Sequence, residues 1–168
     1  PNPWDAASAR VLSSLGFEAL ATTSSGFAIQ AGAADGSRAV GRAAVLENCR
    51  EICAATDLPV NGDLENLYAD DPREAAGTIA LAAEAGMVGC SIEDFSCNPE
   101  VGIYDFNLSV ERVQAAVVKL ARGDLGRLDR QLQEARIDWR DVLVPAGLAR
   151  ADWPEQLDAY LEPAEAGA

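Results

Sequence analysis

Three acidic residues stand where their carboxylates could act together. Asp63 and Glu65 follow an apolar stretch in the segment LPVNGDLEN, two residues apart, and Glu93 follows a second apolar stretch in MVGCSIE. Side chains two positions apart on a strand point to the same face of a sheet. We therefore expect the three carboxylates to converge at the end of one sheet face. There they would repel one another unless a cation joined them.

The residue types in the chain narrow the choice of cation. The sequence contains no histidine, which excludes a Ser-His-Asp triad and histidine-ligated zinc. Carboxylate oxygens are ligands for hard divalent ions, so the pattern favours Mg²⁺ or Mn²⁺. A plainer interpretation stays open on spacing alone. In that interpretation each acid is a solvated residue at a strand end or the N-cap of the next helix.

Alternating strands and helices must position these acids. The patterns predict helices at residues 4–15, 41–56, 72–85 and 108–122, and strands at residues 17–23, 58–63 and 87–93. Asp71 and Pro72 are typical of a helix start, and Gly86 is typical of a helix end. The alternation predicts an α/β fold with a parallel sheet. In such folds the chemistry lies at the carboxyl ends of the strands.

Two further segments follow predicted strands. Residues 22–37, TTSSGFAIQAGAADGS, are rich in glycine and small residues, and we expect them to form a loop, which could be merely a flexible connection. Residues 95–102 lie in a second loop, whose composition suits a mobile lid. That loop contains Cys97, a candidate nucleophile, although a lone cysteine without histidine is more often inert.

Composition excludes several classes of partner. The chain has 168 residues and a formal net charge of −14, so nucleic acid and anionic membrane surfaces would repel it. It has no apolar run that could span a bilayer and no signal-peptide pattern. The four cysteines form no CxxC pair, and we expect a reduced, cytoplasmic setting.

Several motifs together resemble the phosphoenolpyruvate mutase and isocitrate lyase superfamily, in particular its phosphonomutase-like and methylisocitrate-lyase-like members. The similarity is nearly continuous over residues 1–122, through NPWD, TTSSGFA, GDLEN followed by DDP, GCSIED and IYDFNLSVERVQAA. The resemblance implies a TIM-barrel-like (β/α)₈ fold with Mg²⁺ at the carboxyl ends of the strands. It also implies an enzyme that makes or breaks C–C or C–P bonds next to an α-oxo or α-hydroxy acid.

The resemblance assigns roles to individual residues. Asp63 matches the acid nearest the metal, and Glu65 and Glu93 match two further acids of the metal site. Asp35 matches an acid that supports the metal through water.

The same resemblance places a substrate site in the first of the two loops. The residues that match the loop holding the substrate carboxylate, largely through backbone N–H groups, are Ser25, Gly26 and Phe27. The general acid or base is unknown, with Cys97 and Asn98 as weak candidates on the second loop.

The departures from the family pattern are informative. The lyase branch carries a lysine-cysteine-glycine-histidine signature where this chain has FSCNPEVGIYDFN, which puts isocitrate cleavage in doubt. The strand with a substrate-binding arginine, expected soon after residue 122, is not visible, although residues 141–148 resemble the family's sixth strand. We expect one barrel domain over residues 1–168, with residues omitted after about residue 122. The alternative is a truncated protein that needs a partner to close it.

The sequence thus predicts a Mg²⁺- or Mn²⁺-dependent lyase, with phosphonomutase activity as a possibility, acting on a small di- or tricarboxylate. We expect a homo-oligomer, a dimer or tetramer, because the family assembles in this way. The alternative is a degenerate, inactive member that serves as a binding or assembly subunit. A P-loop or dinucleotide-binding domain is disfavoured, because the glycine-containing segment has neither GxxxxGK[ST] nor GxGxxG.

Overall fold

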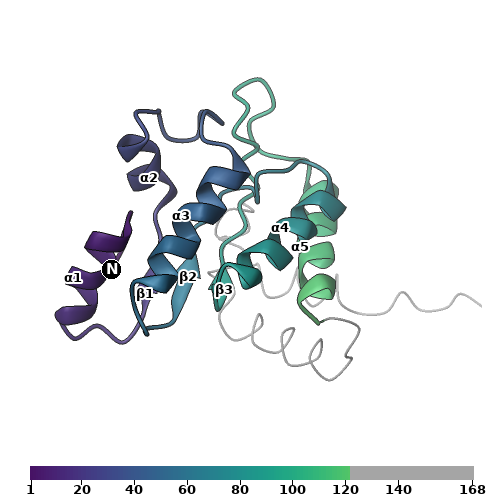
Figure 1. Cartoon of the computed structure of the whole chain (residues 1–168). Coiled ribbons are helices and arrows are strands. Elements are labelled where there is room, and N and C mark those ends of the chain that lie inside the picture. The colour runs from purple at the N-terminus through teal and green to yellow at the C-terminus, as the bar shows by residue number, and fades with distance from the viewer. Residues whose placement is uncertain (122–168) are drawn as a thin grey trace, which may run out of the picture.

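A three-stranded parallel sheet organises residues 1–121, the part of the chain that this computed structural model describes. Its strands are β1 (Leu20–Ala21), β2 (Val60–Gly62) and β3 (Gly89–Cys90), in the order β1-β2-β3 (Figure 1). Leu20 lies opposite Val60, and Asn61 lies opposite Gly89. Parallel neighbours need crossover connections, and α3 (Arg42–Ala54) and α4 (Pro72–Glu84) provide them.

The other helices are α1 (Ala6–Ser14), α2 (Ser24–Gln30) and α5 (Phe106–Ala121). α1 starts with a capping box, in which the Asp5 carboxylate accepts from Ser8 N at 2.6 Å and Ser8 Oγ accepts from Asp5 N at 3.1 Å. The predicted start of α4 is confirmed, since Asp71 caps it and Pro72 is its first residue. Gly86, with φ +100°, follows the end of α4, a backbone conformation that glycine tolerates best.

The predicted order of strands and helices is confirmed, but the strands are shorter than expected. Each strand has only two or three paired residues. The predicted loop at residues 22–37 is wrong in part, because residues 24–30 form α2. Thr23 caps this helix, and Gly26 fits because a Cβ there would lie 2.6 Å from Thr23 Cγ2 and 3.2 Å from Trp4 Cβ. Gly26 therefore permits close packing rather than flexibility.

The core lies between the sheet and its covering helices. α3 contributes Val45, Leu46, Cys49 and Ile52, and α4 contributes Ala75, Ile79 and Ala82. Val60 of β2 and Leu64, two residues after the end of this strand, are almost completely buried. α4 and α5 pack side by side (Figure 1).

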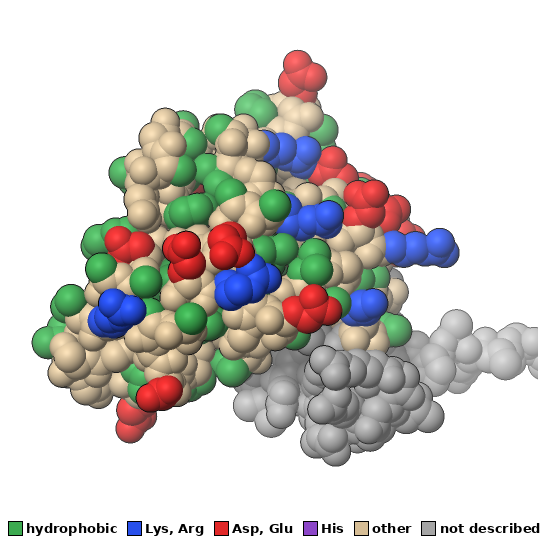
Figure 2. All heavy atoms as spheres, in the orientation of Figure 1, with side chains coloured by type: hydrophobic (Ala, Val, Ile, Leu, Met, Phe, Trp, Pro, Cys, Tyr) green, Lys and Arg blue, Asp and Glu red, His purple; other side chains and the backbone are tan. Residues whose placement is uncertain are grey.

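Some predictions concern residues 122–168, which lie outside the described part: the end of the last helix, the omission near residue 122 and the strand at 141–148. Within residues 1–121, no helix is long and apolar enough to cross a membrane. Acidic and basic side chains are interspersed with apolar ones on the face seen in Figure 2.

Candidate functional site

Asp63 lies directly after β2 and is held in one orientation by residues that follow the neighbouring strands. Its Oδ2 accepts hydrogen bonds from Ser24 N at 2.8 Å and from Ser24 Oγ at 2.9 Å. Its Oδ1 is 3.5 Å from Ser91 Oγ, and its own N–H donates to Thr22 Oγ1 at 2.9 Å. The carboxylate is thus fixed at the carboxyl ends of all three strands.

Glu65 and Glu93 lie beside each other just beyond the sheet. The N–H of Glu93 donates to the carbonyl oxygen of Glu65 at 2.8 Å, which continues the pairing of the two chain segments past β2 and β3. Glu65 is only 8% exposed and Glu93 is half-buried. Burial raises the pKa of both carboxyl groups, and the nearby charges of Asp63 and Asp35 raise the pKa further.

The four acids therefore act on one another, and this arrangement suits a cation. In residues 1–121 no three of the Cys, Asp and Glu side chains are close enough to hold one ion directly. Mg²⁺ usually keeps several waters and takes only one or two protein carboxylates. The acids present fit such a cation, with Asp63 as the oriented ligand and Glu65, Glu93 and Asp35 acting through water. Their roles as metal ligands stay a prediction.

The predicted substrate loop, Ser25 to Phe27, forms the first turn of α2. Gly26 N donates to Thr23 Oγ1 at 3.2 Å and Phe27 N donates to Thr23 O at 3.1 Å, so both amides already have acceptors. Among the described residues, the amide of Ser25 has none. Ser25 is therefore the member of this trio best placed to offer an N–H group to a ligand.

The loop after β3 folds back as a hairpin. Phe95 and Ile103 form an antiparallel bridge, and Ser96 N donates to Gly102 O at 2.8 Å. Asn98 accepts the amides of two following residues on its carbonyl oxygen and a third on its side chain. These contacts give Asn98 a structural role in the turn.

Cys97, a residue of this hairpin, is buried, and its thiol donates to Glu65 Oε2 at 3.4 Å. Burial, together with the adjacent Glu65 charge, raises the pKa of the thiol to about 12. A thiol that stays protonated is a poor nucleophile, so the geometry favours a hydrogen-bonding role for Cys97.

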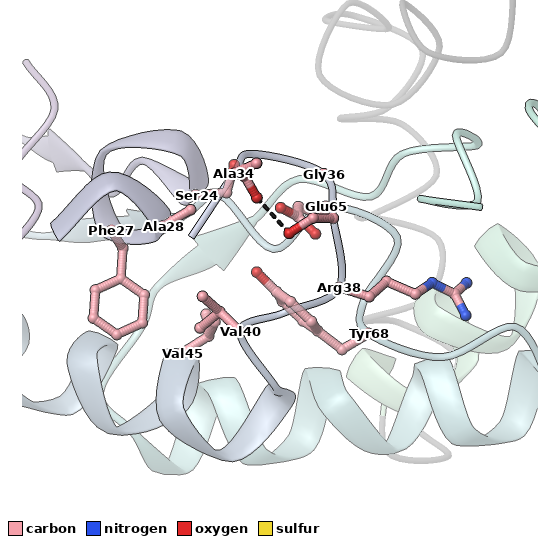
Figure 3. Close-up of a pocket in the computed structure, with 11 residues that line it drawn as sticks. Ser24, Phe27, Ala28, Ala34, Gly36, Arg38, Val40, Val45, Glu65 and Tyr68 are labelled. Carbon is pink, nitrogen blue, oxygen red and sulfur yellow. Dashed lines mark hydrogen bonds between the residues drawn. The ribbon is translucent and has the colours of Figure 1, made fainter. Parts of the chain in front are cut away.

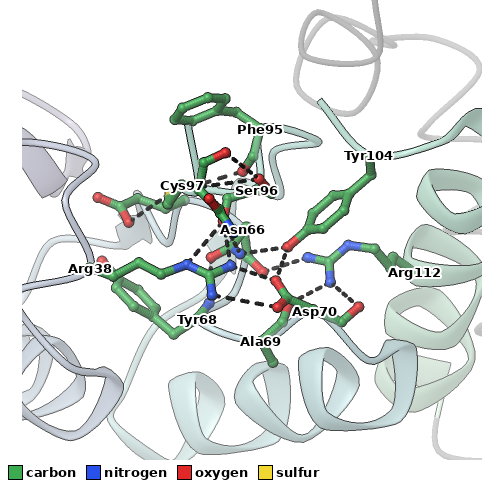
Figure 4. A network of polar contacts seen from close by, with 12 residues as sticks. Arg38, Asn66, Tyr68, Ala69, Asp70, Phe95, Ser96, Cys97, Tyr104 and Arg112 are labelled. Carbon is green, nitrogen blue, oxygen red and sulfur yellow. Dashed lines mark hydrogen bonds and ion pairs between the residues drawn. The ribbon is translucent and has the colours of Figure 1, made fainter. Parts of the chain in front are cut away.

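A polar network under the hairpin was missed by reasoning from the sequence (Figure 4). Arg112 of α5 is 1% exposed, donates to the backbone carbonyls of Asn66, Ala69 and Asp70, and lies 4.4 Å from the centre of the Tyr104 ring. Arg112 lies three residues after Ser109 and four before Ala116, on the buried face of α5. This helical spacing is the sequence pattern that could have predicted a buried arginine.

Arg38 joins the same network from the loop before α3. Its guanidinium forms an ion pair with Asp70 at 2.5 Å and donates to the carbonyl oxygen of Ser96. Tyr104 donates to the same Asp70 carboxylate, and these contacts lower the pKa of Asp70. The network fastens the hairpin to the chain segment that follows Glu65.

A small recess lies between α2, the loop before α3 and the segment after β2 (Figure 3). It has room for roughly one water molecule, about 10 Å³. Its polar lining comes from Ser24, Ser37, Arg38, Glu65 and Tyr68. The recess therefore opens beside two residues of the acidic site, Glu65 and the serine that orients Asp63.

Solved structures of two Burkholderia cenocepacia J2315 proteins are similar to this chain. One, described as a candidate lyase/mutase, is 51% identical, with a TM-score of 0.69 over 73% of this chain and 43% of that protein. The other, described as a candidate phosphonomutase, is 39% identical, with a TM-score of 0.65 over 72% of this chain and 47% of that protein.

A third structure, of 2,3-dimethylmalate lyase, a member of the phosphoenolpyruvate mutase/isocitrate lyase superfamily, is 30% identical, with a TM-score of 0.65 over 73% of this chain and 43% of that protein. An uncharacterized protein of Mycobacterium tuberculosis is 35% identical over 96 residues, which are 57% of this chain and 35% of that protein. The chain thus spans less than half the length of these relatives.

The model of the phosphoenolpyruvate phosphomutase family matches residues 1–153. The predicted resemblance and the predicted barrel-type α/β fold are confirmed by this match and by the structural neighbours. The chain therefore belongs to the phosphoenolpyruvate phosphomutase family, within the superfamily of phosphoenolpyruvate mutase and isocitrate lyase.

Proposed function

We propose that this protein is a lyase or mutase, dependent on Mg²⁺ or Mn²⁺, that cleaves a C–C or C–P bond next to the oxo- or hydroxy-bearing carbon of a small di- or tricarboxylate. One observation carries the proposal. Asp63 is oriented by two hydrogen bonds from Ser24 at the carboxyl ends of the strands, with Glu65, Glu93 and Asp35 around it. In a family of lyases and mutases, this acidic edge is where the reaction would occur.

The chemistry follows from the charge that the reaction creates. When the bond next to an α-oxo carboxylate breaks, its electron pair stays on the carboxylate fragment as an enolate. A divalent cation held by Asp63 would supply positive charge for the oxygens of that fragment. The N–H of Ser25, which has no acceptor among the described residues, would bind the substrate carboxylate and fix its orientation.

The hairpin at residues 95–102 supports the reaction by limiting water. Its Ser96 and Cys97 are buried, and Cys97 donates to Glu65 within the acidic site. Stray protonation by water would divert an enolate, so a cover over the site preserves the intended product. Cys97 would form part of this cover and would hold the Glu65 carboxylate in place through its hydrogen bond.

Relatives with a named activity support the choice of substrate class. Two of them are a 2,3-dimethylmalate lyase and an oxaloacetate acetylhydrolase, at 30% and 25% identity. Both names refer to four-carbon dicarboxylate skeletons that bear an oxygen next to a carboxylate. We infer the same class for this protein and leave the individual compound to experiment.

The test is a substrate panel with the purified protein and Mg²⁺. Oxaloacetate, methylisocitrate, 2,3-dimethylmalate and phosphonopyruvate are incubated in turn while release of pyruvate, oxalate or phosphoenolpyruvate is followed, with Asp63→Asn as the inactive control. We expect release from at least one compound and none with the control. If metal binds but no compound is cleaved, the protein is a binding or assembly subunit instead.

We also propose that the protein is a cytoplasmic homo-oligomer, a dimer or a tetramer. Several large apolar side chains are exposed in the described part, among them Leu15, Ile29 and Val88, each at least 67% exposed. Its four cysteines are free thiols, which fits a reducing compartment. Light scattering at micromolar concentration should show more than one chain per particle, and a uniform monomer would contradict the oligomer.

A further inference from the structure

Tyr68 is the residue of the recess that the proposed reaction has not used. It lies three residues after Glu65 and lines the recess together with Ser24 and Glu65. In Figure 3 its hydroxyl points into the space between these two residues, whereas the guanidinium of Arg38 turns away from it. Its ring packs against the hydrophobic core.

The backbone holds Tyr68 in a strained conformation. Its φ is +55°, a left-handed value that costs a bulky residue about 1–2 kcal/mol. Tyr68 N donates to Asn66 Oδ1 at 3.1 Å, and Asn66 Nδ2 donates to the Tyr104 hydroxyl at 2.7 Å. Arg112 binds the carbonyls of Asn66 and Ala69, on either side of Tyr68. The direction of the side chain is therefore fixed in advance of any ligand.

The hydroxyl at the end of this fixed side chain has no partner in the described part of the chain. No described residue forms a hydrogen bond with it. On the neighbouring carboxylates, Glu65 Oε2 accepts from Cys97 and Asp63 Oδ2 accepts from Ser24. Burial and the charges of Glu65 and Asp63 raise the pKa of Tyr68, so the phenol stays neutral and can donate.

We propose that Tyr68 is a substrate-binding residue, whose hydroxyl donates a hydrogen bond to an anionic oxygen of a carboxylate ligand bound beside the acidic site. The choice of ligand class rests on the proposed function. A rigid neutral donor needs an acceptor, and a carboxylate or enolate oxygen is a stronger acceptor than water. A tyrosine that served packing alone would need no hydroxyl pointing into a recess.

The test compares wild type with Tyr68→Phe, which removes only the hydroxyl, and with the control Ser13→Ala, which removes a hydroxyl that binds Ala9 and Thr56 away from the recess. Calorimetry measures Mn²⁺ binding first and then oxalate binding to the Mn²⁺-loaded protein. For Tyr68→Phe we expect unchanged Mn²⁺ affinity and oxalate affinity weaker by about tenfold or more. For Ser13→Ala we expect oxalate affinity within about threefold of wild type, because the lost hydroxyl has no contact with the recess.

If Tyr68→Phe folds, three outcomes overturn the inference, and they differ in their consequence for the proposed function. Equal oxalate affinity of Tyr68→Phe and wild type removes the role of Tyr68 and leaves the proposed function standing. Loss of Mn²⁺ affinity in Tyr68→Phe assigns the hydroxyl to the metal site instead. Failure of wild type to bind oxalate with Mn²⁺ or Mg²⁺ overturns both proposals. If Tyr68→Phe does not fold, the tyrosine difference spectrum of wild type on oxalate binding decides, and an unchanged spectrum refutes the inference.

Discussion

Replacing Asp63 with asparagine should weaken metal binding but stabilise the metal-free protein. The negative charge of Asp63 attracts a cation, but it also repels the neighbouring acids. Asparagine keeps an oxygen that can accept the two hydrogen bonds from Ser24 but removes the negative charge. A divalent ion and one negative charge about 4 Å apart attract by about 2 kcal/mol even with the full screening of water. We therefore expect Mg²⁺ affinity to fall by about thirtyfold or more.

The same substitution should stabilise the protein when no metal is present. After burial, the charge of Asp63 is among the causes that raise the pKa of Glu65 and Glu93, so the acids repel one another. Removing one of these partly solvated charges should relieve about 1 kcal/mol of repulsion. For a chain of 168 residues, this raises the melting temperature by about 2–4 °C.

The assay combines calorimetric titration with Mg²⁺ and thermal unfolding in EDTA. Ser24→Ala is the matched variant, because it deletes the hydroxyl bond to Asp63 and keeps the backbone bond and the charge. It should weaken Mg²⁺ binding by about tenfold without raising the melting temperature in EDTA. If Asp63→Asn bound Mg²⁺ like wild type, or unfolded at a lower temperature in EDTA, Asp63 would be a structural acceptor and the metal assignment would be wrong.

Three further predictions concern stability and motion. Burial raises the pKa of Glu65 above its usual 4.5, so the native state binds more protons than the unfolded state. Stability in EDTA should therefore fall as the pH rises above 4.5, and urea titrations of Glu65→Gln should show a smaller fall. Arg38→Ala removes the donors to the hairpin carbonyl, so hydrogen exchange of residues 95–102 should accelerate by about tenfold, while the surface control Arg50→Ala leaves it unchanged. Arg112→Met leaves three carbonyls without their donor and should lower the unfolding free energy by about 3 kcal/mol. If urea titration showed a decrease in unfolding free energy of less than about 1 kcal/mol, the buried network would not have the stabilising role assigned to it.

The fold could be predicted from periodicity and caps, because these depend on neighbouring residues. Asp71-Pro72 and Gly86 marked the ends of α4 within one residue. α2 was missed because its sequence, SSGFAIQ, has small polar residues and a glycine where a helix former is expected. Its start depends on the Thr23 cap and on the close approach of Trp4, and the second of these is a contact between residues distant in sequence.

The alternation of side chains along a strand, from which the acidic site was predicted, holds for only part of that site. Strand alternation was used to place Asp63 and Glu65 on one face, but β2 ends at Gly62 and Glu65 has φ +47°. Glu65 joins the site because its carbonyl oxygen accepts the N–H of Glu93. The convergence predicted from two-residue spacing therefore arises from pairing beyond the strands, which no local pattern encodes.

The conformation of the segment after Asp63 could not be predicted from the sequence. Glu65, Leu67 and Tyr68 all have positive φ, although none is glycine, and each such residue costs about 1–2 kcal/mol. Complete burial of Leu67 and the carbonyl bonds of Arg112, from α5, offset that cost. The direction of Glu65 and Tyr68 thus depends on a helix about 40 residues further along the chain. A substitution that loosens the contact of α5 with this segment should therefore disturb ligand binding before it unfolds the sheet.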